Sequence, residues 1–116
     1  MLLLDAGDGT QDVALTHHGD RRVHITSLIW LPEIIAKLEV KHGVTVEEIE
    51  EVFEMGPVFR RGPKGKRRGE DVYRAYGRSE AGRYLAVAFI YKLDRRALIL
   101  SGREMTTAEL RLYRRR

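Results

Sequence analysis

The sequence predicts a small single α+β domain, an antiparallel sheet with helices packed mainly on one face. Three observations predict it. The chain has 116 residues, which suits one domain. Two helical segments precede three strand-like runs that are joined by short connections, and a third helical segment closes the chain. The hydrophobic fraction of 43% is sufficient for a core without disulfides.

Residues 1–22 are predicted to be a loosely structured N-terminal extension to a domain over residues 23–116. They are largely polar and rich in glycine, and they lack periodicity. A start of the natural chain near Val23 is the alternative. His17, His18 and His24 lack further partners at ligand spacing, which favours surface histidines over a metal site.

The first half of the domain is typical of one strand and two helices. Residues 23–30 are rich in β-branched and apolar side chains, which indicates a strand. Pro32 suits the first turn of a helix, and Gly43 suits its C-cap. The predicted apolar stripe of this helix is Ile34, Ile35, Leu38 and Val40. Thr45 and Glu48 form a capping box that opens the second helix.

The second half reads as a loop, three strands and a helix. Residues 60–69 carry six basic residues and no acid, so we expect a mobile loop there, with residues 58–59 an optional short strand. Strands are predicted at 72–77, 83–92 and 97–102, and their short connections indicate antiparallel hairpins. Thr106 and Glu109 form a second capping box, which opens the last helix.

Charge is strongly segregated along the chain. The net charge of +4 divides into −2 over residues 1–28, −5 over 29–59 and +11 over 60–116. This polarity predicts that the C-terminal half meets a polyanion or an acidic partner, the alternative being solvated faces that segregate by sequence alone.

Composition also excludes several classes of protein. The absence of cysteine excludes disulfides, Cys-ligated zinc and thiol catalysis. No apolar run is long enough for a membrane span, and the first residues lack the basic flank of a signal peptide. The cytoplasm is therefore the expected location.

Short motifs along the domain follow the order of a known family. They are Trp30 with Pro32, Lys41-His-Gly-Val44, Glu51-Val-Phe53, Gly-Glu-Asp at 69–71, Gly77-Arg-Ser79, Gly82-Arg83, Leu100-Ser-Gly-Arg103, Glu109 and Tyr113. As an ordered set over residues 28–113, they make the chain resemble the BrnT toxins, ribonucleases of bacterial toxin–antitoxin pairs with a RelE-like fold.

The resemblance implies a toxin that cleaves RNA, with mRNA as the expected substrate, and so arrests translation. It also implies neutralisation by an antitoxin related to BrnA, itself a DNA-binding repressor, in a complex that regulates its own operon. Several family positions that are commonly polar are apolar in this chain: Leu31, Ile34, Leu38, Val72 and Leu110. A catalytically weakened module that binds antitoxin or nucleic acid is therefore the second hypothesis, and a nucleic-acid-binding domain unrelated to toxins is the third.

Metal-independent RNA cleavage needs a base for the 2′-hydroxyl, an acid for the leaving oxygen and cations for the phosphorane. The candidate catalytic residues are Lys41, His42, Arg78, Arg103 and Glu109. The candidate RNA-binding residues are Arg60, Arg61, Lys64, Lys66, Arg67, Arg68 and Tyr113. No metal or cofactor is expected. Each candidate residue has a structural alternative. His42 and Lys41 end a helix, Glu109 caps one, the arginines are exposed loop residues, and the tyrosines cover the sheet.

Overall fold

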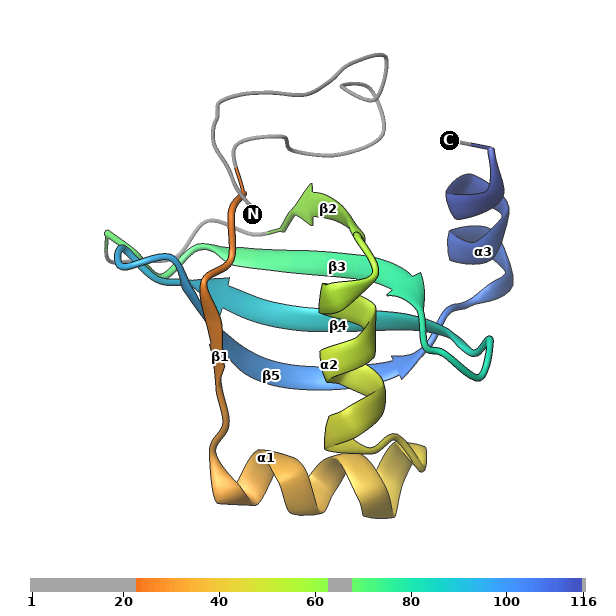
Figure 1. Cartoon of the computed structure of the whole chain (residues 1–116), viewed down its shortest axis with the longest axis horizontal. Coiled ribbons are helices and arrows are strands. Elements are labelled where there is room, and N and C mark those ends of the chain that lie inside the picture. Colours follow the sequence, from red (N-terminus) through yellow and green to blue (C-terminus); the bar gives the residue numbers. More distant parts are fainter. Residues whose placement is uncertain (1–22, 63–67, 116) are drawn as a thin grey trace.

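The computed structural model describes residues 23–62 and 68–115 and confirms a single α+β domain (Figure 1). The elements in chain order are β1 (Ser27–Ile29), α1 (Pro32–Lys37), η2 (Leu38–His42), α2 (Val46–Glu54), β2 (Val58–Arg61), β3 (Val72–Arg78), β4 (Tyr84–Tyr91), β5 (Arg96–Glu104) and α3 (Thr107–Arg114). No helix in the described ranges is long and apolar enough to cross a membrane.

The five strands form one sheet in the order β1-β5-β4-β3-β2. The predicted hairpins β3–β4 and β4–β5 are confirmed, and β2 pairs antiparallel with β3. One pairing departs from the prediction, because β1 runs parallel to β5. The two helices that follow β1 carry the chain across the sheet, so β1 occupies the edge opposite β2. The strand is also shorter than the predicted 23–30.

The hydrophobic core lies between the sheet and the helical layer of α1, η2 and α2. Figure 1 shows α2 crossing in front of β3, β4 and β5. Leu38, Val44, Ile49 and Val52 are fully buried on the helical side. Gly102 permits this close approach, since a Cβ there would lie 2.7 Å from Cδ1 of Ile49. The predicted arrangement, with helices mainly on one face, is confirmed.

The predicted helix from Pro32 to Gly43 changes character halfway. After Lys37 it widens into the π-helical turn η2, in which the N–H of Gly43 donates to the carbonyl of Leu38, five residues earlier. Gly43 then adopts a φ of 60°, as predicted for the C-cap. The prediction that Val40 belongs to the apolar stripe is wrong, because Val40 is 85% exposed. Leu38 faces the core, and a residue two positions later lies on the opposite side of a helix.

The basic segment begins in the sheet rather than in a loop. Arg60 and Arg61, predicted as loop residues, belong to β2, and the optional strand at 58–59 extends through them. An edge strand accommodates charged side chains because they remain in solvent. Lys64, Lys66 and Arg67, together with residues 1–22, lie outside the described residues, and Arg68 is exposed in a turn.

Candidate functional site

The sheet face that points away from α2 carries a cluster of arginines. Tyr73, Ala75 and Gly77 of β3 are buried toward the helical layer, so strand alternation places Arg74, Tyr76 and Arg78 on the other side. Strand register adds three more residues. Arg60 is paired with Arg74, Tyr84 is paired with Arg78, and Arg103 is joined to Tyr76 through Ala86 of β4. We call the set of Arg60, Arg74, Tyr76, Arg78, Tyr84 and Arg103 the outer face.

Arg103 and Glu109 form a bidentate ion pair beside this face. The two guanidinium nitrogens of Arg103 donate to the two carboxylate oxygens of Glu109, at 2.7 and 2.9 Å. Glu109 also accepts the N–H of Thr106 at 2.9 Å, which completes the predicted capping box. The hydrogen bond from Arg103 is the main cause that lowers the pKa of Glu109 to about 2. Glu109 is thus a weak base that fixes the direction of a guanidinium.

Tyr76 stands among the charges of the outer face. Its pKa is raised, first by burial and then by the charge of Glu109, while the charges of Arg74, Arg103 and Arg60 act in the opposite direction. The phenol therefore stays protonated at neutral pH. Among the described residues, no hydrogen bond partner of its hydroxyl is found. Neither Arg74 nor Tyr76 is among the candidates predicted from sequence, although the alternation in β3 places both on the same face as Arg78.

Tyr84 is the contact between the outer face and α3. The guanidinium of Arg78 lies 5.0 Å from the centre of its ring, and that of Arg114 lies 5.2 Å away. The ring of Tyr113 meets Tyr84 edge-on at 5.8 Å. Tyr113, a predicted RNA-binding residue, therefore packs α3 against the sheet, and the same contacts hold Arg78 near the beginning of β4.

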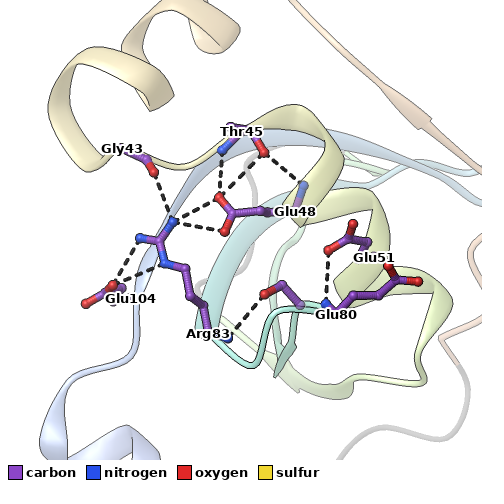
Figure 2. Close-up of polar contacts among 8 residues, drawn as sticks. Gly43, Thr45, Glu48, Glu51, Glu80, Arg83 and Glu104 are labelled. Carbon is purple, nitrogen blue, oxygen red and sulfur yellow. Dashed lines mark hydrogen bonds and ion pairs between the residues drawn. The ribbon is translucent and has the colours of Figure 1, made fainter.

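A second polar network joins the helical layer to the same end of the sheet (Figure 2). Nη1 of Arg83 donates to the carbonyl of Gly43 at 2.9 Å and to Oε1 of Glu48, also at 2.9 Å. Its Nη2 donates to Glu104 at 3.0 Å. Burial lowers the pKa of Arg83, but the hydrogen bonds with Glu48 and Glu104 outweigh it and raise the pKa overall. Arg83 thus connects η2, α2 and β5.

The five predicted catalytic residues lie at one end of the sheet, where β3 and β5 end and β4 begins. Arg78 and Arg103 belong to the outer face, and Glu109 of α3 lies beside it, paired with Arg103. Lys41 and His42 are exposed at the end of η2, on the helical side, next to Gly43 and the Arg83 network. Among the described residues, no hydrogen bond or ion pair connects either of them to Arg103 or Glu109.

The predicted RNA-binding arginines divide between the two faces. Arg60 belongs to the outer face, whereas Arg61 turns to the helical side, where it pairs with Asp71 at 2.7 Å and lies over the ring of Tyr73. In the part of the chain that the structure describes, no group of three or more acidic, histidine or cysteine side chains could hold a metal ion. The side chains of the outer face themselves are cationic or hydrogen-bonding groups.

Comparison with known proteins gives one family. Residues 30–109 match the family model described as the ribonuclease toxin, BrnT, of type II toxin–antitoxin systems. The match begins at Trp30, directly after β1, and ends at Glu109 in the capping box of α3. It therefore includes β2, β3, β4 and β5, the strands that form the outer face. No curated protein matches the chain.

Proposed function

Since the chain belongs to the BrnT family of ribonuclease toxins of type II toxin–antitoxin systems, we propose that it cleaves RNA on its outer face, independently of metal ions. The expected substrate is mRNA, so that cleavage arrests translation. The toxin domain would span residues 23–116, with residues 1–22 as an extension outside it.

The observation that carries this proposal is the gathering of four guanidiniums on one sheet face. Arg60 and Arg74 form one cross-strand pair, and Arg78 and Arg103 lie toward the α3 end of the sheet. Guanidiniums bind phosphate oxygens through fixed forks of N–H donors, so a row of them suits a nucleic-acid backbone. Arg103 is the best oriented of the four, because Glu109 holds two of its nitrogens.

The proposed reaction is attack of a ribose 2′-oxygen on the adjacent phosphorus. A bond forms between that oxygen and phosphorus while the bond from phosphorus to the 5′-oxygen breaks, which leaves a 2′,3′-cyclic phosphate and a 5′-hydroxyl. Arg78 and Arg103 would stabilise the charge that develops on the phosphorane. His42, with Lys41 beside it, is the proposed proton acceptor for the 2′-hydroxyl and donor to the 5′-oxygen, on RNA that passes around this end of the sheet.

The antitoxin is the second proposed partner of this surface. A type II toxin has a protein antitoxin, and an acidic or amphipathic antitoxin segment fits the same cations as RNA does. We therefore propose that RNA and antitoxin, expected to resemble BrnA, compete for the outer face.

A catalytically weakened toxin-like module is the alternative function. It is favoured by the apolar residues at commonly polar family positions, of which Leu38 is fully buried in the core and Val72 lies within β3. Such a module would bind RNA or antitoxin through the same arginines without cleaving.

The test is incubation of the purified protein with a long RNA, with and without EDTA, followed by analysis of fragment ends. We expect cleavage in both conditions, cyclic phosphate ends, and a loss of at least tenfold in Arg103→Ala. Arg96→Ala is the matched control, because Arg96 also lies on β5 and pairs with a carboxylate, that of Asp94. Binding without cleavage would favour the alternative, and cleavage only without EDTA would contradict the metal-independent mechanism.

A further inference from the structure

We infer that the hydroxyl of Tyr76 binds the RNA phosphate that Arg103 holds, as a neutral hydrogen-bond donor in the centre of the outer face. This inference rests on the proposed function and adds to it a substrate-contacting residue that is not among the candidates predicted from sequence.

Strand register places the two side chains on either side of one small residue. Tyr76 is paired with Ala86, and Ala86 is paired with Arg103. All three point to the outer face, and β4 contributes only a methyl group between the two longer side chains. The outer strands β3 and β5 are about 10 Å apart, since each neighbour adds ~4.8 Å. A phosphate group fits within that span and can accept hydrogen bonds from both sides.

The hydrogen-bonding state of Tyr76 distinguishes it from the other sheet tyrosine with a clearly assigned hydroxyl. The hydroxyl of Tyr91 already accepts the N–H of His24 at 3.1 Å and donates to the carbonyl of His24 at 3.3 Å. That of Tyr76 has no such partner among the described residues. A half-buried hydroxyl beside three arginines, with no acceptor within residues 23–62 and 68–115, is suited to an anion that arrives from solvent.

The protonation of Tyr76 defines what it can do there. Burial and the charge of Glu109 raise its pKa, so the phenol keeps its proton at neutral pH. It can donate to a phosphate oxygen, and such a bond strengthens as charge accumulates on the phosphorane. Arg103 would supply the charge, Glu109 would fix its direction, and Tyr76 would supply a further donor.

The experiment compares Tyr76→Phe with Tyr91→Phe by the single-turnover rate of RNA cleavage and by thermal denaturation. Tyr76→Phe removes a hydroxyl that has no hydrogen-bond partner in the described part of the chain, so we expect an unchanged melting temperature and a cleavage rate lowered about tenfold or more. Tyr91→Phe removes the two bonds to His24, so we expect a lower melting temperature and an unchanged cleavage rate.

Wild-type cleavage together with an unchanged rate in folded Tyr76→Phe would overturn the inference and leave the proposed function intact. Absence of cleavage by the wild-type protein would overturn the proposed function instead. In that event, titration with inorganic phosphate, followed by NMR of the Tyr76 and Arg103 amides, still tests the contact. We expect weaker phosphate binding in Tyr76→Phe, and equal affinities would overturn the inference.

Discussion

At the residue scale, the pair of Arg103 and Glu109 bears on two requirements of the proposed phosphate site that usually conflict, a fixed orientation and a full positive charge. A guanidinium that binds phosphate must be held in one orientation, yet the carboxylate that holds it cancels part of its charge. Glu109 orients Arg103 with two hydrogen bonds and caps α3 with a third. The positive potential of the outer face then depends on Arg60, Arg74 and Arg78, for which the structure gives no carboxylate partner among the described residues.

The low pKa of Glu109 predicts a specific dependence of stability on pH. A carboxyl group whose pKa falls to about 2 on folding, from an ordinary value near 4.5, stabilises the fold fully above pH ~4.5. That contribution disappears as the pH falls toward 2. We expect Glu109→Gln to cost about 1 to 2 kcal/mol near neutral pH, allowing for solvent screening of the partly exposed pair.

Urea denaturation of the wild-type protein and Glu109→Gln from pH 6 to pH 3 measures this effect. The difference in unfolding free energy should be constant above pH ~4.5 and shrink below it. A difference that stays constant down to pH 3 would show that Glu109 is not held by Arg103 in solution. Glu80→Gln, which alters an exposed carboxylate of a turn, is the control.

Only part of the site at this scale is visible in the sequence. The capping role of Glu109 could be predicted because Thr106 stands three residues before it. Its pair with Arg103 could not, since that depends on how the chain turns from β5 into α3. The neighbours of Tyr76 could not be predicted either, because the register of two strand pairs places Ala86 and Arg103 beside it.

At the element scale, the side chain of Arg83 connects the helical layer to the sheet through hydrogen bonds. It lies in the connection between β3 and β4, and its guanidinium reaches the end of η2, the beginning of α2 and the end of β5 (Figure 2). The planar fork is necessary, because the three acceptors lie in different directions and an ammonium group offers no such fixed set of donors.

Arg83→Lys should therefore lower stability although the charge is retained. We expect the free energy of unfolding to fall by about 1 to 3 kcal/mol, the usual cost when a charged group loses a hydrogen-bond partner. Arg96→Lys is the control, because the pair of Arg96 with Asp94 is exposed to solvent, and such pairs contribute little to stability. Denaturant unfolding measures both. Equal effects of the two substitutions would mean that Arg83 does not connect the elements.

The elements themselves were largely predictable, and their partners less so. Both capping boxes, Gly43 at its C-cap and the two hairpins follow from local sequence, because each depends on a few neighbouring residues. The parallel pairing of β1 with β5 depends on contacts between segments far apart in the chain. The spacing of apolar residues within each segment does not indicate such contacts. The π-helical turn at η2 was missed because its widened hydrogen bonding leaves no distinct pattern in the sequence.

At the scale of the whole molecule, charge segregation in the sequence corresponds to two sides of the fold. The acidic segment 29–59 supplies the helical layer, whereas the basic C-terminal half supplies most of the outer face and α3. We therefore expect RNA to be attracted first to the outer face.

Salt dependence of RNA binding tests that polarity. Each phosphate contact of a single strand contributes about −0.7 to the slope of log affinity against log salt. Arg74→Ala should reduce the magnitude of the slope by about 0.7. Lys37→Ala, which removes the same charge from the exposed end of α1, should leave it unchanged. The measurement is fluorescence anisotropy with a 2′-O-methyl RNA, which the proposed mechanism cannot cleave, and equal slopes for both variants would argue against the outer face.

The proposed boundary of the domain gives one further prediction. A chain that lacks residues 1–22 should unfold with a free energy within about 1 kcal/mol of the full chain, as expected for a terminal extension. Denaturant titration of both chains decides it, and a much larger loss would place these residues in the folded core.

The parallel pair of β1 and β5 also determines when the sheet can be completed during synthesis. Thr26 and Arg95, which hydrogen-bond beside this pair, are 69 residues apart in the chain. Closing so long a loop is slow compared with forming the local hairpins of β3, β4 and β5. During synthesis, the first strand must wait until the last one has left the ribosome, and the same last strand carries Arg103. A nascent chain therefore lacks the proposed phosphate-binding centre until β5 has been made.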